Sequence, residues 1–241
     1  LDLKTDRIAS VEALVRWHHP TRGYLSPDSF IPLAEKSDHI ADMTLFVLQR
    51  TLRDLSQWHA AGMEVKAAVN ISARLLTSQV FFEAVRAALA ESETSASHLI
   101  FEVTESATMA DPSAALRALE GYRQMGIMIS LDDYGTGQST LTYLRTLPIG
   151  ELKIDRSFVE NAHEDSSDAL LVRSTVHLAH ALGLQVVAEG IETKECLDFL
   201  REVGCDLAQG YHVSRPLPAP DLLALCQRYT GVASLPERSA A

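Results

Sequence analysis

Short apolar runs that end abruptly at a polar residue recur along the chain. In most cases that polar residue is a carboxylate or a carboxamide, and one run carries a lysine. Apolar runs of this length with polar boundaries are typical of strands. The seven runs are residues 8–14 with Glu12, 65–69 before Asn70, 99–101 before Glu102, 127–131 before Asp132 and Asp133, 151–155 with Lys153, 184–188 before Glu189, and 206–208 before Gln209.

Segments with helical periodicity separate these runs. They cover residues 44–60, 81–89, 113–125, 169–182 and 193–203. Asp111 before a proline and Thr193 before an acidic turn predict two helix starts. Gly126, Gly183 and Gly204 predict three helix ends, because glycine adopts the backbone conformation that stops a helix.

Strands that alternate with helices of about ten residues predict a mainly parallel α/β sheet. Polar residues follow nearly every strand, which fits a closed ring better than an open doubly wound sheet, where polar ends gather at one switch point. We therefore predict a TIM-like (β/α)₈ barrel. Only seven strands are visible, so we expect the barrel to be truncated at the N-terminus, with a bare strand edge at the gap.

Composition narrows the classes of function. The 241 residues are 46% hydrophobic, yet no apolar run reaches the ~20 residues that span a bilayer. Lys plus Arg number 21 and Asp plus Glu number 32, so the net charge of −11 argues against binding to DNA or to an anionic membrane. Three cysteines without CxxC spacing favour reduced thiols and a cytoplasmic location over disulfides or structural zinc.

The residues at the strand ends indicate metal chemistry. In a barrel the carboxyl ends of all strands meet on one face, which would gather five carboxylates, two carboxamides and Lys153. A hard divalent cation with oxygen ligands would relieve the repulsion among those carboxylates. The adjacent Asp132 and Asp133 could share two cations, an arrangement suited to phosphoryl displacement. A single acidic strand end is more often a cap or a solvated group, so this prediction depends on the whole series.

An ordered series of motifs resembles the EAL-domain family of cyclic di-GMP phosphodiesterases. The Glu-Ala-Leu triplet at residues 12–14 is short and occurs often by chance, but the resemblance extends in order over residues 1–228. The further motifs lie at residues 25–27, 30–35, 69–72, 102–105, 132–137, 152–158, 188–192 and 209–211.

The resemblance implies both a fold and a reaction. The family fold is a modified TIM barrel whose first strand runs antiparallel to the others. Family members are bacterial signalling hydrolases that cleave one phosphodiester bond of cyclic di-GMP to give linear pGpG, using Mg²⁺ or Mn²⁺. Two ions and a metal-bound hydroxide nucleophile are implied. We expect residues 1–230 to form this domain, without the family's usual first helix and strand, and residues 231–241 to form a flexible tail.

The resemblance also implies a role for each matching residue. The implied metal ligands are Glu12, Asn70, Glu102 and Asp132 for one ion and Asp132 and Asp133 for the other, with Glu189 and Gln209 nearby, directly or through water. The implied catalytic residues are Lys153, Glu189 and Glu12, and Lys153 would orient or deprotonate the attacking water.

Substrate contacts are implied for three residues. Arg16 would contact a phosphate through a charge-assisted hydrogen bond, Leu14 would pack against the dinucleotide, and Gln209 would lie beside it. Glu105 would hold in place the loop that follows Asp133, a loop that contributes to dimer contacts in the family.

Two departures from the family pattern matter. Gln138 stands where an aromatic residue is usual, which we expect to change loop packing only modestly. The family's first strand, with a substrate-contacting glutamine, precedes the point where this chain begins, and this leaves the activity of the chain itself open. Fusion to sensor or diguanylate cyclase domains and a homodimer are further expectations from the family.

Two other functions stay open. A non-catalytic cyclic di-GMP receptor would share the fold, although such relatives usually lack a metal ligand and this chain lacks none. An enolase-like barrel would also place a lysine and carboxylates at strand ends, but the aspartate pair and the carboxamides favour phosphoryl chemistry. His18 and His19 are interpreted as part of a solvated loop, His177 and His180 as helix-surface residues, and residues 164–168 as an exposed acidic loop that caps a helix.

Overall fold

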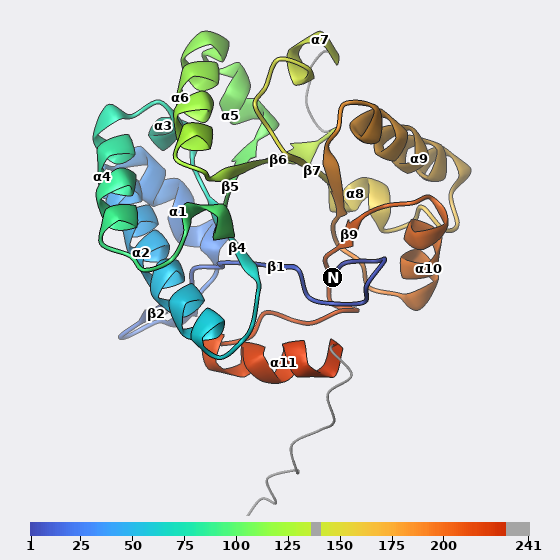
Figure 1. Ribbon diagram of the computed structural model, residues 1–241, viewed down its shortest axis with the longest axis horizontal. Coiled ribbons are helices and arrows are strands. Elements are labelled where there is room, and N and C mark those ends of the chain that lie inside the picture. Colours follow the sequence, from blue (N-terminus) through green and yellow to red (C-terminus); the bar gives the residue numbers. More distant parts are fainter. Residues whose placement is uncertain (136–140, 230–241) are drawn as a thin grey trace, which may run out of the picture.

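The protein folds around a curled parallel sheet with helices on its outer face (Figure 1). The structure is a computed structural model that describes residues 1–135 and 141–229. Seven strands of the described residues follow one another in chain order around the sheet, from β1 through β4 to β9, and every neighbouring pair is parallel. The TIM-like α/β class is confirmed.

The elements alternate as the polar and apolar pattern predicts. The strands are β1 (Ser10–Glu12), β2 (Trp17–His19), β3 (Gly23–Leu25), β4 (Lys66–Asn70), β5 (Leu99–Thr104), β6 (Met128–Tyr134), β7 (Glu151–Ile154), β8 (Gln185–Ala188) and β9 (Leu207–Ala208). The α-helices are α1 (Pro27–Lys36), α2 (His39–Ala60), α3 (Ala73–Leu76), α4 (Gln79–Ala90), α5 (Glu105–Met109), α6 (Pro112–Gln124), α7 (Leu141–Leu144), α8 (Arg156–Val159), α9 (Ser166–Ala181), α10 (Lys194–Glu202) and α11 (Leu222–Tyr229). Two short 3₁₀ helices are η1 (Ala96–His98) and η2 (Ala219–Asp221).

Side-chain caps fix the starts of the predicted helices. The Asp111 carboxylate accepts from the Ala114 amide at 3.0 Å at the start of α6, and the Thr193 hydroxyl accepts from the Cys196 amide at 3.2 Å at the start of α10. Asp165, in the acidic run, caps α9. Each cap satisfies an amide that has no partner within the helix, which is worth about 1 kcal/mol. These capping predictions are confirmed.

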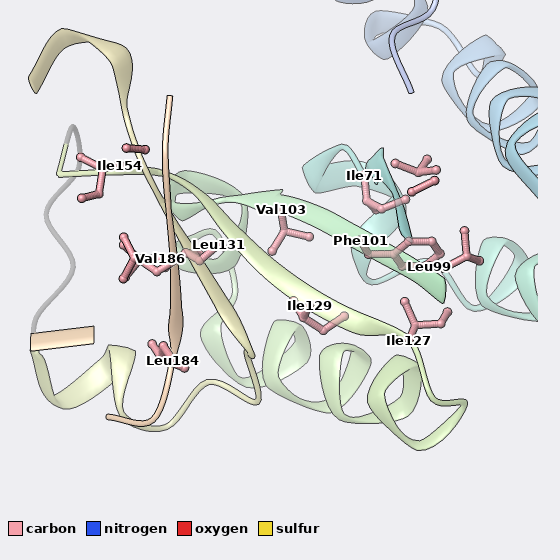
Figure 2. Packing of buried hydrophobic residues seen from close by; sticks show 14 of the residues in the cluster. Ile71, Leu99, Phe101, Val103, Ile127, Ile129, Leu131, Ile154, Leu184 and Val186 are labelled. Atoms are coloured by element: carbon pink, nitrogen blue, oxygen red, sulfur yellow. The ribbon is translucent and has the colours of Figure 1, made fainter. Parts of the chain in front are cut away.

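Alternate residues of β5 and β6 face opposite environments. Figure 2 shows Phe101, Ile129 and Leu131 among the buried apolar side chains that pack beside the helices. The Phe101 ring lies edge-on to Tyr122 of α6, with the ring centroids 5.1 Å apart. Each such buried side chain stabilises the fold by about 2–3 kcal/mol relative to exposure. Because strand side chains alternate, Glu102 points the other way, into the barrel.

The first residues of the chain cover part of the gap between β9 and β1. Residues 1–3 run antiparallel to β9: the Ala208 amide donates to the Leu1 carbonyl at 2.9 Å, and the Leu3 amide donates to the Asp206 carbonyl at 2.9 Å. The expectation of a bare strand edge is therefore wrong for β9.

The segment with His18 and His19 forms a hairpin, so its interpretation as a loop is wrong. Strand β2 pairs antiparallel with β3, and the His18 ring contacts Tyr24 edge-on with centroids 4.9 Å apart. Strands of three residues are too short for a pattern of apolar and polar residues to reveal them.

On α9, the Nε2 atom of His180 is hydrogen-bonded to Oδ2 of Asp206 at 2.8 Å.

Two sequence predictions lie outside the described residues. They are the packing of Gln138 and the flexible tail at residues 231–241. Within the part of the chain that the structure describes, no helix combines the length and the apolar character needed to cross a bilayer.

Candidate active site

Side chains from the carboxyl ends of the strands converge on one face of the barrel. Glu12 ends β1, Asn70 ends β4, Glu102, Asp132 and Lys153 lie within β5, β6 and β7, and Glu189 and Gln209 directly follow β8 and β9. In the parallel register Asn70 pairs with Glu102, and Asp132 pairs with Thr104, two residues further along β5 than Glu102. The face opens into a cavity of about 310 Å³, the size range of small-molecule sites.

Lys153 lies at the centre of the converging carboxylates. Its side chain is only 2% exposed, and Nζ lies 2.6 Å from Glu189 Oε1, 2.9 Å from Glu102 Oε1 and 3.4 Å from Asp132 Oδ1. Burial lowers the pKa of Lys153, but the charges of Glu102, Glu189 and Glu12 outweigh it and raise the pKa above its usual value. The ammonium therefore stays charged at neutral pH.

Glu12 joins the two ends of the sheet. Its Oε1 accepts from Asn70 Nδ2 and its Oε2 accepts from Gln209 Nε2, both at 2.7 Å. Burial raises the pKa of Glu12, but the Lys153 charge and these two hydrogen bonds prevail and lower it. Glu12 is therefore an ionised carboxylate that links β1 to the segment after β9.

A β-bulge places Asp132 and Asp133 together at the site. Between Leu131 and Tyr134 the register of β6 against β7 shifts by one residue, and Asp133 adopts a left-handed φ of 57°. In a regular strand consecutive side chains point to opposite faces, and a bulge re-aims them. The strand continues to Tyr134, so the prediction that it ends at Leu131 is wrong by three residues.

Negative charge accumulates around Lys153 beyond what one ammonium neutralises. Burial raises the pKa of Glu102 well above its usual value, and the charges of Glu12 and Asp132 add to the rise. Burial, together with the charge of Asp132, raises the pKa of Glu189 to about 7 against the opposing effect of Lys153. Burial and the charge of Asp132 also raise the pKa of Asp133. Binding of protons or of additional cations to these carboxyl groups would therefore stabilise the site.

The cation-free protein is expected to lose stability as pH rises from 5 to 8. The Glu189 pKa is about 7 in the folded protein against 4.5 ordinarily, so the folded state binds this proton more tightly. The corresponding stability is complete below pH 4.5 and is lost as pH rises through 7, a loss of about 3 kcal/mol. Urea unfolding in EDTA at several pH values measures it. Glu189→Gln should make the profile less steep, with the raised pKa values of Glu102 and Asp133 accounting for the slope that remains, and a flat wild-type profile would contradict the expectation.

The comparisons with known proteins identify the family of this fold and site. The EAL domain model matches residues 1–216. The chain belongs to the EAL domain family. The chain is 45% identical over 215 residues to the bifunctional diguanylate cyclase/cyclic di-GMP phosphodiesterase MucR of Pseudomonas aeruginosa. This match covers 89% of the present chain and 31% of MucR. It is 43% identical over 240 residues to the cyclic di-GMP phosphodiesterase NbdA of the same organism, with coverage of 99% and 31%.

A solved structure extends the likeness to three dimensions. The PaMucR phosphodiesterase in complex with c-di-GMP matches this EAL domain with a TM-score of 0.84 at 44% identity, covering 88% of this chain and 86% of that one. The EAL domain of Mycobacterium smegmatis DcpA matches with a TM-score of 0.80 at 31% identity, covering 95% and 94%. The chain spans about 31% of the length of MucR and NbdA.

The donor set of this EAL domain fits hard divalent cations. The converging groups offer the carboxylate oxygens of Glu12, Glu102, Asp132 and Glu189 and the amide oxygen of Asn70. Carboxylate and amide oxygens are the ligands that Mg²⁺ and Mn²⁺ prefer. Among the described residues no group of three acidic, histidine or cysteine side chains is arranged to hold a cation. Three of the carboxylates instead contact the Lys153 ammonium. Cations would compete with Lys153 for these ligands.

Three further predicted site residues are not among those that line the cavity. Leu14 and Arg16 continue the chain beyond Glu12 and are exposed, and the Arg16 guanidinium donates to the neighbouring Val15 carbonyl at 2.9 Å. Glu105 is buried at the start of α5. Burial, together with the charge of Glu105, raises the pKa of Tyr134, which places Glu105 beside the end of β6.

Sequence reasoning assigned no role to Arg156, Glu192 and Tyr211, which also line the cavity. Arg156 Nη2 lies 2.9 Å from Glu192 Oε1. A Cβ on Gly190 would lie 2.2 Å from Arg156 Cγ, so the arginine stem crosses the backbone beside Glu189. The sequence did contain a signal for two of these residues: Arg156 lies three residues after Lys153, and Glu192 lies three residues after Glu189.

Proposed function

We propose that this EAL domain hydrolyses one phosphodiester bond of cyclic di-GMP to linear pGpG with two Mg²⁺ or Mn²⁺ ions. The observation that carries the proposal is the convergence of Glu12, Glu102, Asp132, Glu189 and Lys153 beside a cavity of about 310 Å³. Relatives named as cyclic di-GMP phosphodiesterases and a related structure with c-di-GMP support the choice of substrate.

The acidic residues would hold the cations. Glu12, Asn70, Glu102 and Asp132 suit one ion, and Asp132, Asp133 and Glu189 suit the other. The cations would neutralise phosphate charge and lower the pKa of water.

Lys153 would act beside the cations. Because its pKa is raised in the cation-free protein, Lys153 would stay protonated and would orient the attacking water and stabilise negative charge, not remove a proton. Glu189, as a proposed cation ligand, lies beside this ammonium, with Oε1 2.6 Å from Lys153 Nζ.

Two exposed residues that follow Glu12 in the chain, together with Gln209, would bind the dinucleotide. Arg16 supplies a cation for a phosphate, Leu14 an apolar surface for the dinucleotide, and Gln209 an amide at the cavity edge. Glu105 would hold the loop after Asp133. A homodimer is a further proposal, which rests on the family alone.

The full-length protein, its location in the cell and its partners can also be proposed. The chain spans 31% of MucR and NbdA, which supports fusion to other domains, such as sensor or diguanylate cyclase domains. All three cysteines are free and buried, which supports a cytoplasmic location. The net charge of −11 supports a domain that binds neither DNA nor membrane.

Incubation of the purified protein with Mn²⁺ and cyclic di-GMP tests the proposal. Chromatography should show pGpG, and EDTA should abolish its formation. Binding of cyclic di-GMP without pGpG would instead support the alternative function, a non-catalytic receptor. Absence of both would refute the proposed substrate.

A further inference from the structure

A second, smaller cavity lies inside the barrel next to the lysine centre. Its volume is about 20 Å³, which is enough for one water molecule. Its polar lining residues are Ser10, Glu12, Glu102, Glu151, Lys153 and Gln209, and its other walls are apolar. A cavity of this size with several polar groups has the chemistry of an internal water site.

Glu151 is a buried acid of this cavity that the proposed reaction does not use. It begins β7 two positions before Lys153, so both side chains point to the barrel interior. Glu151 is 3% exposed, and its Oε2 atom has no hydrogen-bond partner. Glu102 Oε2, on the wall of the same cavity, also lacks one. Buried polar atoms nearly always have a partner, so both oxygens call for one.

We propose that an ordered water in this cavity joins the Glu151 carboxyl to Glu102, and that Glu151 thereby acts as a positioning residue for Glu102 and Lys153. Its catalytic meaning rests on the proposed phosphodiesterase function. Glu102 lines the small cavity and is not among the residues that line the large one, and its Oε1 lies 2.9 Å from Lys153 Nζ. Glu151 therefore acts through these two residues and not on the substrate.

The Glu151 carboxyl suits a bridging role. A water can donate one hydrogen bond to Glu151 and one to Glu102, because a carboxyl group accepts hydrogen bonds whether or not it is protonated. A glutamine amide accepts through its oxygen in the same way, whereas a methionine of similar length offers only the weak acceptor of its sulfur. The two substitutions therefore separate hydrogen bonding from packing.

Glu151→Gln and Glu151→Met test the proposal as a pair. Glu151→Gln should keep kcat and Mn²⁺ affinity within about threefold of wild type. Glu151→Met should lower kcat or Mn²⁺ affinity by about tenfold or more, the usual effect of losing a group that supports a ligand. The midpoint of urea unfolding of Glu151→Met should be unchanged or higher, because an apolar side chain replaces a buried acid. A loss of function without a loss of stability excludes a purely structural role.

Crystallography and calorimetry keep this test independent of turnover. A crystal structure at about 1.5 Å resolution should show a water within hydrogen-bond distance of Glu151 and Glu102 in wild type and Glu151→Gln, but not in Glu151→Met. A dry cavity in wild type, or full kcat and Mn²⁺ affinity in Glu151→Met, would overturn the proposal. A wild-type protein that shows the water and binds Mn²⁺ but forms no pGpG would count against the phosphodiesterase function alone.

Discussion

Replacement of Lys153 by methionine is expected to lower kcat at least a thousandfold and to destabilise the cation-free protein by about 3–5 kcal/mol. The ammonium is 2% exposed and contacts Glu102, Asp132 and Glu189. Without it, buried carboxylates face one another with no positive charge between them. Turnover of cyclic di-GMP and urea unfolding in EDTA measure the two effects.

Divalent cations separate the two roles of Lys153. Mn²⁺ should restore most of the stability of Lys153→Met, because it supplies positive charge to the same carboxylates, but it should not restore turnover. Lys194→Met is the matched control, since Lys194 is exposed and pairs with Asp198 on the surface; it should alter stability by less than about 1 kcal/mol and leave turnover intact. Recovery of turnover in Lys153→Met with Mn²⁺ would show that the lysine only balances charge.

The gathering of the site could be predicted from the sequence because it depends on topology. Parallel strands present their carboxyl ends on one side, so residues as distant as Glu12 and Gln209 meet once the sheet curls. Strand and helix periodicities determine that topology locally. The hydrogen bond between these two residues, at 2.7 Å, is a direct consequence of it.

The details that need three-dimensional packing could not be predicted. The bulge at Asp132 and Asp133 depends on one extra residue in β6 relative to β7, and no pattern in β6 alone reveals this. The central place of Lys153 depends on the lengths of three side chains that reach it from other strands. Residues 1–3 pair with β9 through backbone atoms, which carry no sequence signal.

The same reasoning explains why Arg156 and Glu192 escaped notice. The residues predicted for the site lie at strand ends, where a side chain can point into the barrel. Arg156 and Glu192 lie on the segments that follow the strands and line the cavity from there. Their ion pair is exposed on both sides, so neither burial nor periodicity distinguishes it. Rim residues of this kind are found only when the cavity itself is described.

Substitution of Glu12 by alanine is expected to reduce cyclic di-GMP hydrolysis at least a thousandfold. Glu12 is the ionised carboxylate nearest the gap between β1 and β9, and its loss removes a proposed cation ligand and leaves the Asn70 and Gln209 amides without their shared acceptor. Turnover with Mn²⁺, and Mn²⁺ affinity by calorimetry, should fall together.

Glu12→Gln distinguishes the charge from the hydrogen bonds. It keeps the shape and one acceptor but sets its NH2 group against one of the two amide donors, so it should be destabilised by about 1–3 kcal/mol. Its turnover should fall as in Glu12→Ala, because an amide does not replace a carboxylate at a cation. Glu83→Ala on the exposed face of α4 is the surface control and should retain full activity. Hydrolysis retained by Glu12→Ala would remove Glu12 from the proposed ligands, and with it the argument that convergence at the strand ends produces the chemistry.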